Sequence, residues 1–321
     1  MHVYHGLSQL PQAFGPSVVT LGNFDGVHRG HQQVLSWLVA EAVRQKASSV
    51  VITFDPHPLE VHRPDSAPGQ IMSLAQRLDA LASTGLDATV VIRYTLDFAR
   101  STPEEFVRSV LVGNLQAKTV VVGQDVRFGR DNSGDLHTMQ EMGEQFGFAV
   151  VVVDELGERR RWSSTWVREA LDRGAVEEAA DILGHPHTMV GEVVHGAARG
   201  RDLGFPTANL APEAEGYIPA DGVYAGWLVD AAGTRWPAAI SVGSNPTFEG
   251  VSRQVEAHVL DRPVELVEDF DLYGQRVRVE FVARLRGMVA YTGPEALIEQ
   301  MCQDVADSRI ILAEAAKGVE R

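Results

Sequence analysis

Short runs of apolar, mostly β-branched residues alternate with amphipathic segments through the first half of this 321-residue chain. Strands that are apolar on both faces are typical of a parallel sheet covered by helices on both sides. The pattern therefore predicts a doubly wound α/β domain, whose ligand should lie at the carboxyl ends of the strands. The predicted strands are Val18–Leu21, Val50–Phe54, Thr89–Ile92, Lys118–Val122 and Ala149–Val153, and the predicted helices are His31–Gln45, Leu74–Leu81, Leu136–Phe146, Thr165–Asp172 and Val176–Leu183, with a further helix capped by Thr102 and Glu105.

The pattern changes after Gly184-His185-Pro186, which we interpret as a break between domains. Strand-like segments are then separated by Gly, Pro and Asp, and helical spacing returns only at Pro294–Ala315. This predicts a small antiparallel β-barrel with a C-terminal helix. The expected domains are residues 1–184 and 185–321. The predicted barrel strands lie around Met189–Val194, Val223–Val229, Ala238–Val242, Val255–Leu260 and Val277–Leu285.

The charge balance limits the possible partners. Lys and Arg number 28 against 43 Asp and Glu, a formal net charge of −15. Such a chain offers no general basic face to nucleic acid or to a membrane surface, so a phosphate ligand would need a local pocket. The lone Cys302 excludes an intramolecular disulfide, and neither a membrane span nor a signal peptide is evident. We expect a cytoplasmic protein with no nucleic-acid or membrane partner, and a homo-oligomer is compatible with the sequence.

Glycines and histidines gather directly after the first predicted strand, Val18–Leu21. Glycines allow close approach of the backbone to a ligand, and a helix N-terminus attracts anions. His28 and His31 could both face one phosphate there and stabilise charge in a transition state. A plain glycine-rich turn with surface histidines is the alternative, and metal binding is weaker because a third ligand is not evident. The stretch comprises Gly22, Asn23, Phe24, Asp25, Gly26, Val27, His28, Arg29, Gly30 and His31.

This stretch, GNFDGVHRGH, resembles the signature of the nucleotidylyl-transferase superfamily, in the form found in prokaryotic bifunctional riboflavin kinase/FAD synthetases. Further motifs follow in the family's order: TFDPHP at Thr53–Pro58, VGQDVRFG at Val122–Gly129 and SSTWVR at Ser163–Arg168. Val126 departs from the family pattern, which has phenylalanine at that position.

The resemblance implies roles for individual residues. His28, His31 and Arg168 would act in catalysis. Ser163, Ser164 and Thr165 stand where a helix is expected to begin, so their hydroxyl and N–H groups could surround an anion, with Arg168 adding a fork of donors. Each of these motifs also has a purely structural interpretation. Ser163–Arg168 could be an ordinary N-cap beside a solvated arginine. Asp125 could cap a turn, and the two prolines of TFDPHP could form a rigid turn. Nucleotide binding is implied for Gly22, Asn23, Phe24, Asp25, Gly26, Gly30, Asp125, Ser163, Ser164 and Thr165, and flavin binding for Phe54, Asp55, Pro56, His57 and Phe128.

A second group of motifs lies in the predicted barrel. Gly200–Asn209, GRDLGFPTAN, resembles the flavokinase motif GRxLGFPTAN. Gly200 and Gly204 suit a loop close to phosphates, while Thr207 and Asn209 place two neutral oxygens on one side of an extended segment, as suits Mg²⁺ with ATP. A glycine-rich turn leading into a strand is the alternative. The other matching segments are Gly222–Ala225, Gly243–Phe248, Val255–His258 and Asp271–Gly274.

Glu256 within Val255–His258 corresponds to the family's general base, although alternation alone would also fit a solvent-facing strand residue. The link at Asp261–Asp269 is longer than usual for the family. The resemblance thus implies a bifunctional enzyme that uses ATP and Mg²⁺ to convert riboflavin to FMN and then FMN to FAD. The alternatives are a single active module, a flavin-binding regulatory or storage protein, and a nucleotidylyl transferase for another phosphate ester.

Overall fold

The computed structural model describes residues 1–153, 161–196, 205–247, 250–261, 272–289 and 291–319. The chain forms two compact units. One contains Met1–Gly69 and Ser73–Ser163, and the other Gln70–Met72 and Ser164–Arg321. The proposed boundary between two functional domains after residue 184 stays a prediction.

The first unit is built on a six-stranded sheet in the order β1-β4-β3-β2-β5-β6, in which all pairs of neighbouring strands are parallel. The doubly wound α/β class is therefore confirmed. The strands are β1 (His2–Tyr4), β2 (Ser17–Leu21), β3 (Ser48–Asp55), β4 (Ala88–Arg93), β5 (Ala117–Val122) and β6 (Ala149–Val152). The helices are α1 (Arg29–Gln45), α2 (Pro58–His62), α3 (Leu74–Ala82), α4 (Pro103–Phe106), which continues into the π-helical segment η4 (Val107–Asn114), and α5 (Leu136–Phe146).

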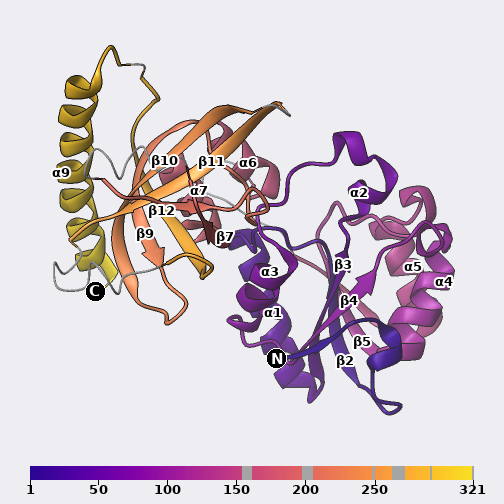
Figure 1. Ribbon diagram of the computed structural model, residues 1–321. Helices are drawn as coiled ribbons and strands as arrows, with labels where there is room; N and C mark the ends of the chain where they lie inside the picture. Colours follow the sequence, from indigo (N-terminus) through magenta and orange to yellow (C-terminus); the bar gives the residue numbers. More distant parts are fainter. Residues whose placement is uncertain (154–160, 197–204, 248–249, 262–271, 290, 320–321) are drawn as a thin grey trace. The chain divides into compact units, whose positions relative to one another are not determined.

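Helices cover both faces of this sheet, with α1 and α3 on one side and α4 and α5 on the other (Figure 1). Val19 is in register with Val50 and Val120, and all three are buried in one cluster with apolar residues of η4 and α5. The stripe formed by Val34, Leu35, Leu38 and Ala42 buries the inner face of α1. Burial on both faces explains why the central strands are apolar without alternation.

The strand order places a switch point between β2 and β5. From β2 the chain builds outward through β3 and β4, whereas β5 and β6 are added on the other side of β2. In open α/β sheets, loops that leave two such strands in opposite directions open a crevice at the carboxyl ends. The loops after Leu21 and Val122 both begin there, and both carry sequence motifs identified above.

The second unit contains a closed antiparallel barrel in the order β10-β11-β8-β7-β12-β9, which confirms the predicted barrel. Helix α9 packs on β9, β10 and β12 (Figure 1). Among the described helices, none is both long and apolar enough to cross a membrane. The elements are α6 (Ser164–Asp172), α7 (Val176–Leu183), β7 (His187–Val194), β8 (Ala208–Leu210), β9 (Gly222–Val229), β10 (Arg235–Thr247), β11 (Gly250–Val259), β12 (Arg276–Arg286) and α9 (Pro294–Val319).

A bidentate ion pair joins α9 to the barrel. Arg286 on β12 donates from Nε and Nη2 to the Asp304 carboxylate at 2.9 and 2.7 Å, and Gln300 adds a third hydrogen bond at 3.0 Å. The Asp304 side chain is only 7% exposed and that of Arg286 20%. Removing one member of a buried pair leaves the other charge uncompensated.

We predict that Asp304→Ala lowers the free energy of unfolding of the barrel unit by about 3 kcal/mol, because Arg286 loses its partner in a poorly solvated position. The Arg309–Asp261 pair, with side chains 52% and 55% exposed, offers a matched control. Arg309→Ala, which removes this pair and leaves the left-handed backbone at Asp261 unchanged, should cost less than about 1 kcal/mol. Urea unfolding followed by circular dichroism compares the two, and equal destabilisation would show that burial does not strengthen the Arg286–Asp304 pair.

Candidate active sites

His28 and His31 lie side by side at the start of α1. His28 is the N-cap residue of this helix, and its Nδ1 accepts a hydrogen bond from the His31 main-chain N–H at 3.3 Å. The two imidazole rings are stacked with centroids 3.6 Å apart and planes inclined by 18°. The helix begins two residues earlier than the predicted His31, and one of its free N–H groups is already satisfied by His28.

Both imidazoles are neutral at physiological pH. Burial, with a smaller contribution from the positive charge of Arg161, lowers the pKa of His28 to about 4. Burial, His28 and Arg161 together hold the pKa of His31 well below its usual value. Because the His28 Nδ1 accepts a hydrogen bond, the proton of the neutral ring lies on Nε2. His28 therefore offers a neutral N–H donor, and the buried Nδ1 of His31 has no hydrogen-bond partner among the described residues.

Arg161 brings positive charge to this site. Its Nη2 donates to Oδ1 of Asp125 at 2.9 Å, which lowers the pKa of that carboxyl group. Asp125 follows β5, which lies across the switch point from β2. The ion pair therefore joins the segments after β5 and β6. Sequence reasoning missed Arg161, because it lies in the run Arg159-Arg160-Arg161 just before the Ser163–Arg168 motif and nothing in the run distinguishes it. In a chain of net charge −15, a local guanidinium is the kind of group that would attract a phosphate.

The Thr53–Pro58 motif contacts the first loop directly. His57 is buried and N-caps α2, accepting a hydrogen bond from the Leu59 N–H at 3.1 Å. Its Nε2 lies 3.0 Å from Nδ2 of Asn23. The structure thus brings together two motifs that are about thirty residues apart in the sequence, at the carboxyl ends of β3 and β2.

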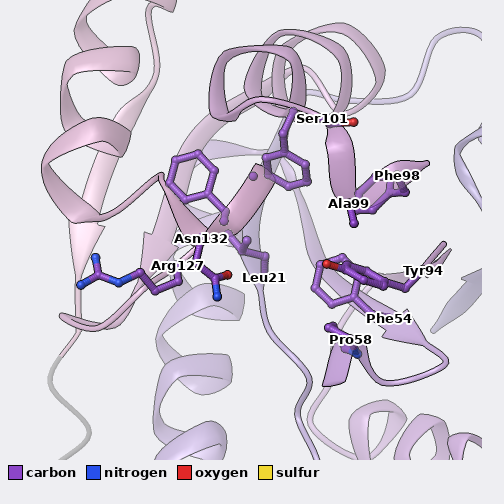
Figure 2. Close-up of a pocket in the computed structure, with 12 residues that line it drawn as sticks. Leu21, Phe54, Pro58, Tyr94, Phe98, Ala99, Ser101, Arg127 and Asn132 are labelled. Atoms are coloured by element: carbon purple, nitrogen blue, oxygen red, sulfur yellow. The ribbon is translucent and has the colours of Figure 1, made fainter. Parts of the chain in front are cut away.

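An aromatic hollow adjoins the same carboxyl ends of the strands. Its volume is about 510 Å³, including the part that is open to solvent. Figure 2 shows Phe54, Tyr94 and Phe98 on one side of it and Leu21, Asn132 and Arg127 toward the other. Rings of Phe54, Tyr94 and Phe98 meet edge-on or tilted at 5.7 to 6.2 Å. The lining residues are Leu21, Phe54, Pro58, Tyr94, Phe98, Ala99, Ser101, Phe106, Arg127, Phe128, Gly129 and Asn132.

Two of the five expected flavin contacts, Phe54 and Phe128, line this hollow, whereas Asp55, Pro56 and His57 do not. Tyr94, Phe98 and Phe106 were not expected from the sequence, because nothing in their local pattern separates a pocket lining from a core. Val126, the departure from the family motif, is partly buried against the neighbouring core cluster.

A second site lies on the barrel. Pairing of β11 with β8 sets Glu256 opposite Asn209, and Thr207 immediately precedes β8. The Thr207 hydroxyl donates to Oε2 of Glu256 at 3.4 Å, and Nδ2 of Asn209 lies 3.3 Å from both Oγ1 and the main-chain oxygen of Thr207. Three oxygen-bearing side chains expected from the sequence therefore meet in one place. Within the part of the chain that the structure describes, no cluster of three or more His, Cys, Asp or Glu side chains could hold a metal.

Gly196 makes this site possible and was missed by the sequence analysis. A Cβ atom at this position would lie 2.5 Å from the side-chain amide of Asn209, closer than any real contact. Gly200, Gly204 and most of the Asp261–Asp269 link lie outside the described residues. Ser164, Thr165 and Arg168 lie on α6 in the second unit, directly after Ser163, and their action on a phosphate stays a prediction.

The lowered pKa of His28 predicts a pH dependence of stability. Between pH 6.5 and about 4, the unfolded chain binds a proton at His28 more readily than the folded chain does. Stability present above pH 6.5 is therefore lost as the pH falls through this window, by about 3 kcal/mol for a shift of this size. The free energy of unfolding should fall less in the His28→Gln variant than in the original protein between about pH 7 and pH 4.5. Urea denaturation at the two pH values measures both changes. Equal losses would contradict a buried, neutral His28.

Comparison with known proteins gives one consistent result for the two halves. A family model described as FAD synthetase matches residues 10–166, and one described as riboflavin kinase matches residues 183–312. The bifunctional riboflavin kinase/FMN adenylyltransferase of Escherichia coli K12 is 36% identical over 306 residues, covering 95% of each chain. That of Pseudomonas fluorescens is 35% identical over 318 residues, covering 98% of this chain and 99% of its own.

A solved structure is similar over nearly the whole chain. It is titled a macrolide-efflux protein from Streptococcus pneumoniae, is 31% identical to this chain and superposes with a TM-score of 0.84. The match covers 96% of this chain and 98% of that one. With both family models in order and relatives above 30% identity over nearly its whole length, the chain belongs to the bifunctional riboflavin kinase/FMN adenylyltransferase family.

Proposed function

We propose that this chain makes FMN and then FAD in two ATP-dependent steps, at two chemically different sites. The observation that carries this proposal is the meeting of Thr207, Asn209 and Glu256 on the barrel, in a different unit from the paired histidines after β2. Membership of the bifunctional family supports both activities.

In the first step, the 5′-hydroxyl of riboflavin attacks the γ-phosphorus of ATP, and ADP leaves. Glu256 accepts the hydroxyl proton, because an alcohol is a poor nucleophile until its proton has an acceptor. The hydrogen bond from Thr207 holds one carboxylate oxygen of Glu256 in place. Thr207 and Asn209 bind the nucleotide phosphates together with the metal.

The oxygen donors of this site fit Mg²⁺. Thr207 and Asn209 supply neutral oxygens, and Mg²⁺ commonly takes few protein ligands alongside substrate phosphates. When bound, the ion would neutralise charge that develops on the phosphates. Gly196 leaves the space in which Asn209 lies.

In the second step, the phosphate of FMN attacks the α-phosphorus of another ATP, and pyrophosphate leaves. FMN phosphate is already ionised at neutral pH, so positioning and charge stabilisation suffice. The Nε2–H of His28 donates to the α-phosphate region together with His31. Ser163, Ser164, Thr165 and Arg168 hold the leaving pyrophosphate, while the Asp125–Arg161 pair contributes to the nucleotide site.

The aromatic hollow would receive the flavin ring of FMN in this second step. Phe54, Tyr94, Phe98, Phe106 and Phe128 offer apolar faces and edges suited to a large planar heterocycle. Leu21, the last residue of β2, lines the hollow and directly precedes the loop that carries His28. The ring and the phosphate of one FMN molecule could therefore be held by adjacent parts of the same sheet edge.

Single substitutions should separate the two activities. His28→Ala should reduce adenylylation of supplied FMN by about 10²–10³-fold, the scale for loss of one transition-state donor. Glu256→Gln should abolish phosphorylation of riboflavin and leave adenylylation unchanged. Each half-reaction is assayed separately by chromatography of the flavin product. A proportional loss of both activities in either variant would contradict two separate sites.

The overall assignment is tested with the unaltered protein. Incubation with riboflavin, ATP and Mg²⁺ should yield FAD. FMN alone would mean that only the kinase module works, and binding of both ligands without a product would indicate a regulatory or storage protein.

Gly196→Ala should impair only the kinase step. The added methyl group would displace the Asn209 amide, so riboflavin phosphorylation should fall at least about tenfold, while FMN adenylylation stays unchanged. Gly287→Ala is the matched control, because a Cβ there would meet nothing closer than 3.9 Å. Full kinase activity in Gly196→Ala would remove Asn209 from the site.

A further inference from the structure

Arg77 is a buried cation beneath the adenylylation site. It lies on α3 between Leu74 and Leu81, on the face turned to the protein interior, and is 2% exposed. Its Nη1 donates to the main-chain oxygen of Asn23 at 2.8 Å, and its Nη2 donates to that of Phe54 at 3.0 Å. One planar guanidinium thus bridges the backbone at the carboxyl ends of two neighbouring strands, β2 and β3.

The loop that Arg77 holds has an unfavourable backbone conformation. Phe24 and Val27 have φ values of 52° and 40°, in the left-handed region that favours glycine. Val27 is β-branched, for which this region is a genuine outlier. Such residues cost on the order of 1–3 kcal/mol each and persist only where the surroundings determine them. His28, the cap of α1, follows Val27 directly.

Asn23 is the point at which the surroundings hold this loop. Its main-chain oxygen accepts from Thr53 Oγ1 at 3.2 Å as well as from Arg77, and its side chain meets Nε2 of His57 at 3.0 Å. Thr53 and His57 belong to the motif at the carboxyl end of β3. The loop with the paired histidines and the segment from Phe54 to His57 are therefore fixed to each other, with Arg77 joined to both.

The burial of Arg77 carries a cost that a purely apolar contact would avoid. Burial lowers the pKa of its guanidinium, while the negative charges of Asp25, Asp55 and Glu60 act in the opposite direction. Its Nε is buried and has no acceptor among the described residues. An apolar side chain of similar size would remove that cost, but it would leave both bridged carbonyl groups with one donor fewer.

We propose that Arg77 is a positioning residue for FMN adenylylation. It sets the loop that carries His28 and His31 against the segment that carries Phe54 and His57. The inference rests on the proposed function of this site. That function places the reacting phosphates at the loop with His28 and His31, and the flavin ring at the segment with Phe54. The two reacting phosphates would then depend on Arg77 for their alignment, although Arg77 touches neither.

The test compares Arg77→Met and Arg77→Lys in the full chain, with separate assays of the two half-reactions. For Arg77→Met, kcat of FMN adenylylation should fall about 10²-fold, while KM for FMN and ATP changes less than about threefold, because alignment matters more than binding. Arg77→Lys keeps the charge but reaches only one carbonyl group, so kcat should fall about tenfold. Riboflavin phosphorylation should be unchanged in both variants.

Arg108→Lys is the matched control, since Arg108 on η4 is exposed, pairs with Glu104 of α4 and lies over the ring of Phe146. It should leave both activities unchanged. An unchanged kcat in Arg77→Lys, or kinase and adenylylation rates that fall together with the folded fraction, would overturn the proposal. If Arg77→Met does not fold, Arg77→Lys decides alone. Failure of the proposed function is distinguishable, because the unaltered protein would then make no FAD.

Discussion

The divergence of β2 and β5 is the constraint on which the first site depends. Two parallel strands lie side by side and the chain leaves them in opposite directions, so their carboxyl ends open a space that no crossover fills. The loop after β2 uses this space to place two neutral imidazoles at the start of α1, and the loop after β5 brings Asp125 with its partner Arg161. The aromatic hollow borders the same edge and supplies an apolar surface beside these polar groups.

The barrel positions its candidate site residues in a different way, through the pairing of its strands. Here the hydrogen-bond register between β8 and β11 places Glu256 opposite Asn209, and a glycine at position 196 leaves room for the amide. The arrangement needs no helix terminus and no buried imidazole. The two proposed sites thus depend on different features: strained loops held by buried side chains in one unit, and strand pairing in the other. Because of this difference, we expect single substitutions to separate the two activities.

Elements with a long, regular apolar pattern could be predicted from the sequence. The central strands, α5 and the capping box at Thr102 were predicted correctly, because burial and local capping are encoded in neighbouring residues. Strands β1 and β8 were missed, since three residues are too few to show a period. Arg77, Gly196 and Arg161 were also missed. Their importance arises from partners far away in the chain, although a charged Arg77 on the apolar face of α3 was a signal that could have been used.

The central claim is that the two phosphate-handling sites work independently. Mixing His28→Ala with Glu256→Gln tests it most directly, because each variant retains the step that the other lacks. Supplied with riboflavin, ATP and Mg²⁺, neither variant alone should make appreciable FAD, while the mixture should, as FMN released by the first is adenylylated by the second. A mixture that yields no FAD under conditions where the unaltered protein does would contradict the account.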